Sequence, residues 1–471
     1  MAGTAAAVAV GAWWSPAVPL PAAAGVALVA LAWRRPLAVV LAAGLLAAAL
    51  GHRAWAATAP VQAQAWSGEV VFMGDPEPFA SGVRAVVEAD GRRVEASAFG
   101  GAARRLRPRL AGERAQLEGR LRGPAPAMAR RLATRHVLGR LEVTDVGTWR
   151  RGALPWSAAN GLRRVLERGA VSLPEDERSL LTGLVLGDDR YQSPEVQEDF
   201  RAAGLTHLLA VSGQNVAFVL LALAPLLQRL RIRTRLVATI GALAFFAVLT
   251  RYEPSVLRAT TMAGAAVLAA SLGRPASGLR VLALATSALL LVDPLLAHSL
   301  GFQLSVLATA GILVLARPVA VALPGPRWLA SPLAVTLAAQ VATAPLLAAT
   351  IGPVPLAGLP ANLLAGPAAG AVMAYGLVGG LAAGLVPAPL AAVLHMPTRA
   401  LLWWVAAVAR WCAALPLPSL DLQALVMVAA AWALVMAFRR GRDRGRWARR
   451  GGVPTRATPS AGEADADGAP G

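Results

Sequence analysis

Residues 180–220 read LLTGLVLGDDRYQSPEVQEDFRAAGLTHLLAVSGQNVAFVL, and they pass from a polar, acid-bearing segment into an apolar run. Four polar side chains stand at this join, where burial in a bilayer is expected to begin: His207, Ser212, Gln214 and Asn215. The chain before the join is typical of a membrane anchor followed by an external domain. The chain after it is typical of a bundle of membrane helices.

Composition also indicates a membrane protein. Hydrophobic residues make up 56% and charged residues 15% of the 471 positions, with a mean hydropathy of +0.55. Soluble domains average about 45–50% apolar and about 25% charged residues. Apolar runs near the ~20 residues that cross a bilayer as a helix recur in residues 1–56 and 204–438. We predict a multi-pass α-helical membrane protein with about 12 crossings.

The absence of lysine, the single cysteine and the wide spacing of the histidines exclude several kinds of active site. All 45 basic residues are arginine, so there is no lysine for a phosphate-binding loop or a Schiff base. The single cysteine, Cys412, excludes an internal disulfide and a multi-cysteine metal site. The five histidines lie far apart, without metal-ligand spacing. We predict no cofactor.

Residues 57–150 predict a small external β-rich domain. Asp90-Gly91 is a hairpin signal between two alternating segments, and other short alternating segments lie on either side of this pair. The segments are 68–73, 82–89, 92–99, 112–121 and 136–146. Short strands with glycine-rich turns suggest a barrel of the oligonucleotide-binding (OB) type.

A group of arginines in this domain is a candidate for external contact with DNA, since guanidinium groups pair well with phosphate. The group is Arg104, Arg105, Arg107 and Arg109. The alternative is a solvated basic edge strand. Few aromatic residues lie nearby, which gives little support for stacking on bases.

Residues 151–203 predict amphipathic helices at the membrane interface. Leu154, Leu162, Val165 and Leu166 share one face of the first helix. Arg163, Arg164 and Arg168 occupy the other. A second helix is expected from Pro174 to about Gly187. The adjacent carboxylates of Asp188 and Asp189 follow as a weak candidate for a metal site, and a loop at the end of a helix explains them equally well.

Arginine-bearing loops predict the orientation, because short cytoplasmic loops are enriched in Lys and Arg. If the domain at 57–150 lies outside, alternating crossings put these loops and both termini in the cytoplasm. The loops are 229–235, 274–280 and 317–327, and the tail is 439–471. We expect the basic tail to be disordered and to lie near anionic headgroups.

Five motif-like segments occur one after another along the chain. They are GDDR…EDFRAAGLTHLLAVSGQNVAFV (187–219), PSVLRATTM (254–262), LLLVDPLLAHSLGFQLSVLATAGI (289–312), LAAQVATAPLL (337–347) and LPANLLAGP (359–367). Together they resemble the ComEC family, the bacterial competence channels. The resemblance covers 204–438 as a competence channel domain and about 30–190 as an N-terminal domain. It implies a channel in the bacterial cytoplasmic membrane that carries single-stranded DNA inward while the other strand is degraded outside.

The sequence departs from the family pattern in two respects. Many members carry a metallo-β-lactamase-like domain with an HxHxDH motif, and no such histidine cluster occurs here. We therefore expect a separate nuclease, together with a DNA receptor and a cytoplasmic helicase or strand-binding protein. A homo-oligomer is compatible with the sequence. The chain also reads SGQN where many relatives read SGLH, so no role of a histidine at position 215 is carried over.

Nine polar or motif residues are candidates for lining a DNA path. They are His207, Ser212, Gly213, Gln214, Asn215, Arg258, Gln303, Gln340 and Asn362. Their alternative role is hydrogen bonding or packing between helices, with His207 capping or bridging helix ends. Arg258 is expected to face water or to pair with Glu253 or Asp293, since a lone charge in a membrane helix is unfavourable.

No set of residues in the sequence supports a chemical step, so we predict a transport protein rather than an enzyme. Arginines, amides and helix N-termini suit the passage of a polyanion that must bind and be released. Two alternatives remain. One is a transporter of small solutes or lipid-linked substrates, or a membrane transferase, and the other is a non-enzymatic assembly component of a competence complex.

Overall fold

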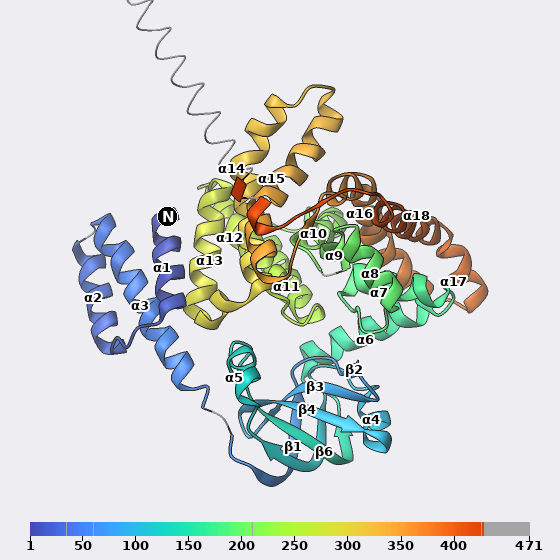
Figure 1. Ribbon diagram of the computed structural model, residues 1–471, viewed down its shortest axis with the longest axis horizontal. Coiled ribbons are helices and arrows are strands. Elements are labelled where there is room, and N and C mark those ends of the chain that lie inside the picture. The colour runs from blue at the N-terminus through green and yellow to red at the C-terminus, as the bar shows by residue number, and fades with distance from the viewer. Residues whose placement is uncertain (34, 60, 210, 425, 428–471) are drawn as a thin grey trace, which may run out of the picture. The chain divides into compact units, whose positions relative to one another are not determined.

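The computed structural model describes residues 1–427 apart from residues 34, 60, 210 and 425. The described chain is mostly helical and contains one small β domain, built from strands β1 to β6 (Figure 1). The end of the last predicted apolar run and the basic tail at 439–471 lie outside the described residues.

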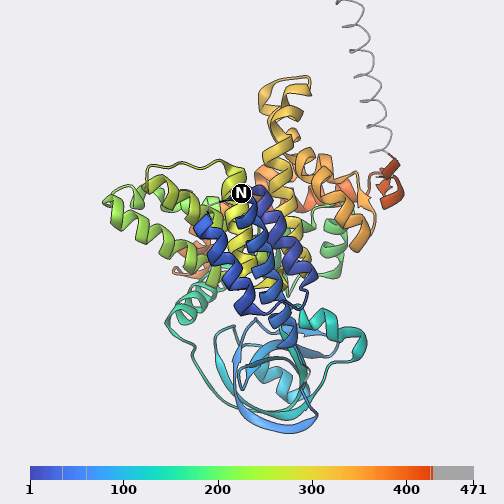
Figure 2. The same cartoon turned by 90° about the vertical axis from the view of Figure 1, so that its left-hand side faces the viewer.

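Three helices form the N-terminal segment, close to the apolar runs that the sequence shows at 2–14, 17–33 and 37–55. They are α1 (Ala2–Trp14), α2 (Leu20–Trp33) and α3 (Pro36–Ala56). A Cβ on Gly11 of α1 would lie 2.1 Å from the carbonyl oxygen of Gly44 in α3, so glycine permits close backbone packing there. Val8 and Ala12 pack on Leu290 of α13 (Gly278–Val292). Figure 2 shows α1 to α3, in blue, beside the yellow helix α13.

Five strands of the β domain close into a barrel. The strands are β1 (Gln64–Phe72), β3 (Gly82–Ala89), β4 (Arg92–Phe99), β5 (Arg114–Arg122) and β6 (Val137–Arg150), with the short β2 (Glu77–Phe79) beside β3. Their order is β1-β5-β6-β4-β3, and β1 also pairs with β3, which closes the ring. β4 and β6 run parallel, and every other pair is antiparallel. Alternate side chains such as Phe72, Val87 and Leu117 fill the interior.

The strand predictions in this domain are confirmed. β3 and β4 have the predicted bounds, and Asp90 and Gly91 have φ of 50° and 72°, as a two-residue hairpin turn of type I′ requires. The sequence interpretation missed β2 and two short helices, α4 (Gly100–Leu106) and α5 (Pro126–Ala133). The alternative of a basic edge strand for the arginine group is wrong, because Arg104 and Arg105 lie on α4 and Arg107 and Arg109 follow it.

Helices make up most of the rest of the described chain. They are α6 (Leu154–Ala170), α7 (Glu175–Leu186), α8 (Pro194–Ala202), α9 (Thr206–Leu209), α10 (Gly213–Leu227), α11 (Ile232–Leu249), α12 (Pro254–Ser271), α13, the 3-10 helix η1 (Pro294–His298), α14 (Leu300–Ala322), α15 (Arg327–Thr350), α16 (Gly358–Ala383), α17 (Ala388–Leu394) and α18 (Met396–Ala413). Helix α7 begins and ends where predicted, and Gly187, with φ of 70°, caps it.

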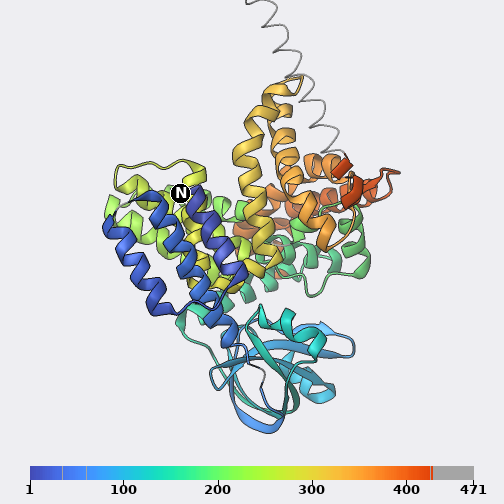
Figure 3. The same ribbon diagram turned by 60° about the vertical axis from the view of Figure 1, so that its left-hand side comes forward.

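Five of the described helices are long and apolar enough to cross a membrane: α3, α11, α14, α15 and α16. The pair α17 and α18, bent by 54°, would be a sixth if it forms one span. These helices make the chain a membrane protein, whereas about 12 crossings stays a prediction. Figure 3 shows α14 and α15 side by side as an antiparallel pair in yellow and orange.

The predicted polar face of α6 differs from the observed one. Arg163 was expected on the exposed side, yet it is only 1% exposed and is among the largest fully buried side chains of the described chain. Leu154, expected on the apolar side, is 83% exposed. Carboxylates contributed by distant segments explain the burial of Arg163, as described below.

Candidate functional site

The first apolar segment of the predicted bundle, residues 204–227, is broken into two helices, α9 and α10. Gly204, with φ of 68°, follows α8, and the single turn α9 carries His207. The chain then leaves the helical path, and Ser212 caps α10 by accepting a hydrogen bond from the backbone N–H of Gln214 (3.3 Å). A helix N-terminus therefore lies inside what reads as a single apolar segment.

His207 joins three helices through a chain of hydrogen bonds. Its Nε2 lies 3.3 Å from Oδ1 of Asn362 in α16. Nδ2 of Asn362 donates to Oγ1 of Thr336 in α15 at 2.8 Å. Gln340 lies one turn beyond Thr336, and its Oε1 is buried without a hydrogen-bond partner in the described part of the chain. An unpaired buried carbonyl of this kind is unfavourable unless a ligand or water meets it.

One face of α16 approaches these groups. Gly358, Asn362, Gly366 and Gly370 recur at every fourth residue and therefore share a face. A Cβ on Gly358 would lie 3.3 Å from Nε2 of Gln340, and one on Gly370 would lie 3.0 Å from the ring of Phe218 and 3.6 Å from Nε2 of Gln214. At Gly366 the nearest atom is Oδ1 of Asn362, 3.8 Å from the Cβ position, so there is open space. The glycines thus leave room between polar side chains.

We call the side chains along this face the polar seam: His207, Gln214, Thr336, Gln340 and Asn362. His207 is surrounded by many protein atoms, yet its side chain and that of Gln214 remain accessible to water. Neutral donors and acceptors between apolar helices can hydrogen-bond a hydrated or polyanionic solute without holding it tightly. The arrangement suits passage better than permanent binding.

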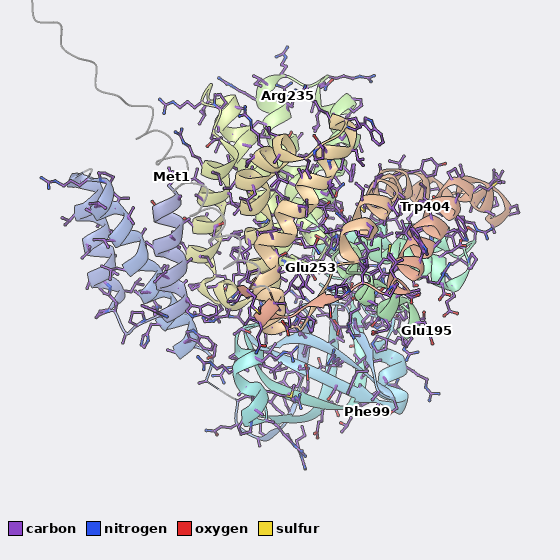
Figure 4. All side chains as sticks on the ribbon, turned by 45° about the horizontal axis from the view of Figure 1, so that its top comes forward. Met1, Phe99, Glu195, Arg235, Glu253 and Trp404 are labelled. Carbon is purple, nitrogen blue, oxygen red and sulfur yellow. The ribbon has the colours of Figure 1, made fainter. Side chains whose placement is uncertain are left out.

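Arg258, in the second turn of α12, lies beside the start of α10, in a different setting from the one expected. Its Nε donates to Oγ of Ser305 in α14 at 2.7 Å, and its Nη1 lies 3.1 Å from Sδ of Met262. Neither Glu253 nor Asp293 forms an ion pair with it in the described chain, so that prediction is wrong. Asp293 instead lies 3.0 Å from Nε2 of His136 at the edge of the β domain. Glu253 lies near the N-terminal end of α12 and is exposed (Figure 4).

Asp188 belongs to a buried ionic cluster of five residues: Asp75, Arg163, Asp188, Arg190 and Arg251. Nη2 of Arg163 lies 3.0 Å from Oδ2 of both Asp75 and Asp188. Arg190 pairs with Asp188 at 2.5 Å, and Arg251 pairs with Asp75 at 2.9 Å. The cluster joins the loop after β1 to α6, to the loop after α7 and to the start of the loop before α12.

Burial alone would raise the pKa of both carboxyl groups in the ionic cluster. The guanidinium groups outweigh this effect: Arg163, Arg251 and Arg190 hold the pKa of Asp75 at about 2, below its ordinary value of 3.8. The hydrogen bond and charge of Arg190, with the charge of Arg163, likewise lower the pKa of Asp188. The pairs are therefore charged at any physiological pH.

Acid is expected to weaken the fold through Asp75. Because its folded pKa is depressed, its stabilisation is complete above the unfolded pKa and is lost as pH falls from about 5 towards about 2. The loss amounts to about 2 kcal/mol, at ~1.4 kcal/mol per pKa unit. Denaturant unfolding across this interval measures it. D75N should lose less stability than the wild type, and equal losses would count against the assignment.

Asp188 and Asp189 do not form a shared metal site in the described chain. Both oxygens of Asp188 contact arginine nitrogens, whereas Asp189 is exposed. Within residues 1–427, leaving out the four undescribed positions, no group of three or more His, Cys, Asp or Glu side chains could hold a metal ion.

Other candidate residues make structural contacts. Asn215 is buried, where its Nδ2 donates to the carbonyl of Leu184 in α7 and its Oδ1 accepts from Ser212. This is the interhelical hydrogen bond that was the alternative to a path-lining role. Gln303 similarly donates to the carbonyl of Ala297 at 2.6 Å.

The arginines of the β domain are partly engaged. Arg105 donates to Asp145 and to the carbonyl of Val146. Arg109 stacks over the ring of Trp149 at 4.4 Å. Arg104 and Arg107 are exposed. The four side chains therefore do not form one uniform basic surface.

The sequence analysis missed several residues of the polar seam and of the ionic cluster. Thr336 and the glycines of α16 carried a readable signal, since Gly358-x₃-Asn362-x₃-Gly366-x₃-Gly370 is the spacing of a close helix contact. Asp75 and Arg251 carried no such signal, because their pairing depends on tertiary structure alone.

Comparison with known protein families matches residues 184–442, more than half of the chain, to the family described as Competence protein. ComE operon protein 3 of Bacillus subtilis (strain 168) is 35% identical over 136 residues, 28% of this chain and 17% of that protein. An uncharacterized protein of Aquifex aeolicus (strain VF5) is 32% identical over 144 residues, 30% of this chain and 34% of that protein. The uncharacterized protein YcaI of Escherichia coli (strain K12) is 29% identical over 149 residues, 30% of this chain and 20% of that protein.

These alignments thus span about a third or less of each relative's own length. No solved structure matches the chain. The family match includes the broken run, the polar seam and Arg258, so the region with the unusual polar groups is also the region that carries the family likeness. The chain belongs to the ComEC family of competence proteins.

Proposed function

We propose that this protein carries single-stranded DNA across the bacterial cytoplasmic membrane during natural transformation. The observation that carries the proposal is the polar seam, a line of neutral hydrogen-bonding groups between apolar helices. A polyanion needs such groups to replace part of its hydration, and it must also leave again. The protein acts in this proposal as a channel and not as the nuclease.

The β domain is assigned to the outer side of the membrane. Figure 4 shows Arg235, in the arginine-bearing start of α11, at the end of the helices away from the β domain, which carries Phe99. Arginine-rich loops favour the cytoplasmic side, so both termini lie in the cytoplasm and about 12 crossings are expected. The closed five-stranded barrel supports an OB-type domain at the entrance.

The partners in this proposal supply what a channel lacks. A separate nuclease degrades the strand that stays outside, a DNA receptor delivers the duplex, and a cytoplasmic helicase or strand-binding protein pulls on the entering strand. The lipid bilayer surrounds the helices. Association of copies of the chain is compatible with the broad apolar outer surface.

Deletion of the gene in its host tests the proposal directly. Uptake of labelled DNA into the cytoplasm should be lost and should return with the wild-type gene. Normal transformation of the deletion strain would contradict the channel hypothesis and would favour the alternative of a transporter for another substrate.

Two glutamines of α10 give a matched pair for testing the seam. Gln214 lies in the seam, whereas Gln228 caps the far end of the same helix and is exposed. Q214L should lower DNA uptake about tenfold, equivalent to a barrier higher by about 1.4 kcal/mol, because an apolar side chain would dry the seam. Q228L should leave uptake unchanged at equal expression. Equal uptake by the two variants would remove Gln214 from the path.

A further inference from the structure

Arg258 is a buried cation without a carboxylate partner in the described chain. The residue is 7% exposed, and its recorded contacts are a hydroxyl group and a thioether, from Ser305 and Met262. Arg163 is the other arginine among the described residues that is less than 9% exposed, and it pairs with two aspartates. A buried charge normally needs a partner of opposite sign.

The remaining nitrogen of Arg258 points at the N-terminus of α10. Its Nη2 makes no hydrogen bond among the described residues and lies 2.8 Å from the position that a Cβ on Gly213 would occupy. The start of α12 is fixed to this place because Oγ of Ser255 donates to the carbonyl of Val211 at 2.6 Å. Gly213 is therefore the residue type that admits the guanidinium.

Two positively charged groups, the N-terminus of α10 and the guanidinium of Arg258, thus lie close together. The first N–H groups of a helix carry a partial positive charge of roughly half a unit, and the guanidinium adds a full one. The proximity of the guanidinium to the helix N-terminus is electrostatically unfavourable without an anion. It becomes favourable when an anion lies between the two groups. Helix N-termini and arginine are both common ligands of phosphate groups.

We propose that Arg258 and the N-terminus of α10 bind one phosphate group of the passing DNA strand. The assignment rests on the proposed function, because Gln214 of the polar seam is the next residue after Gly213. A strand that follows the seam would bring its backbone past this point. The site supplies one charged contact in an otherwise neutral path, which orients the strand and still permits its release.

Binding of a short fluorescent oligothymidylate to the purified full-length protein in nanodiscs tests the proposal. R258Q removes the charge, and G213A keeps the charge but crowds Nη2. R201Q, at an exposed arginine of α8, and G264A, where no atom lies within 4 Å of the Cβ position in α12, are the matched controls. The dissociation constant is measured by anisotropy at several salt concentrations, and thermal unfolding verifies that each variant is folded.

R258Q is expected to weaken binding about tenfold and to reduce the slope of log K against log salt by about 0.7, the value for one phosphate contact on a single strand. G213A should weaken binding in the same direction, and both controls should match the wild type. A wild-type slope in R258Q, or effects equal to those of R201Q, would overturn the assignment.

The source of the phosphate is tested in two further arms. Nanodiscs of phosphatidylglycerol are compared with nanodiscs of phosphatidylcholine, and inorganic phosphate is added as a competitor. Competition by inorganic phosphate in the wild type, absent in R258Q, supports the site. If anionic lipid alone abolishes the difference between wild type and R258Q, the site belongs to a lipid headgroup and the DNA assignment is overturned. Uptake by the deletion strain tests the proposed function separately.

Discussion

D75N is expected to destabilise the folded protein by about 3–5 kcal/mol, the usual effect of removing one partner from a buried ion pair. Asp75 contacts Arg163 and Arg251, and its Oδ1 also accepts a hydrogen bond from the N–H of Ala111 at 2.8 Å. The ionic cluster holds three arginines and two aspartates, so the substitution raises its net charge from +1 to +2 in a buried place. Asparagine keeps the shape of the side chain, which isolates the effect of charge.

The free energy of unfolding at neutral pH, measured by denaturant titration, checks this expectation. D145N is the matched control, because Asp145 pairs with Arg105 on the surface, where both side chains are 62% exposed. Exposed pairs contribute about 0–1 kcal/mol. Similar losses in D75N and D145N would show that the ionic cluster does not stabilise the fold.

G204A is expected to destabilise the protein by about 2–4 kcal/mol and to impair DNA uptake. Gly204 has φ of 68°, which adds about 1–2 kcal/mol for any other residue. Its Cβ would also lie 3.0 Å from Cα of Gly358, and overpacking of this kind adds about 1–3 kcal/mol. Because Asn362 lies one turn beyond Gly358, separating the two backbones would also separate Asn362 from His207.

Two other glycines distinguish the causes. Gly273 has the same φ of 68° but no atom within 4 Å of its Cβ position, so G273A reports the backbone strain alone. Gly301 has neither a positive φ nor a close neighbour, so G301A reports the added methyl group. Thermal unfolding and uptake are compared for the three variants. If G204A resembles G273A in both measurements, the contact with Gly358 has no role in positioning the seam.

Local patterns in the sequence were sufficient for several elements of the fold. Alternation and the Asp90-Gly91 turn gave the bounds of β3 and β4, because register and turn geometry are local properties. Pro174 and Gly187 likewise marked the ends of α7. The helix that carries Arg104 and Arg105 was missed, since α4 has only seven residues and is too short to show a helical period.

Long-range pairing was the part that the sequence could not supply. Arg163 looked like a solvated residue, and only the folded chain brings Asp75 and Asp188 to it. Arg258 was expected to pair with an acid near it in the sequence or in the next motif, and it meets Ser305 instead. His207 and Asn362 were chosen from motif positions, but their contact across α9 and α16 depends on the close approach of Gly204 and Gly358.

The ionic cluster has a consequence for the order of events during biosynthesis. Its members Asp75 and Arg251 are 176 positions apart, so the cluster cannot close until the ribosome has made the chain as far as α11 and the loop after it. Until then Asp75, in the β1–β2 loop, can pair with Arg163 but lacks its second partner, Arg251. Closure of the cluster is thus a late step that depends on both the β domain and the helices after it having been made.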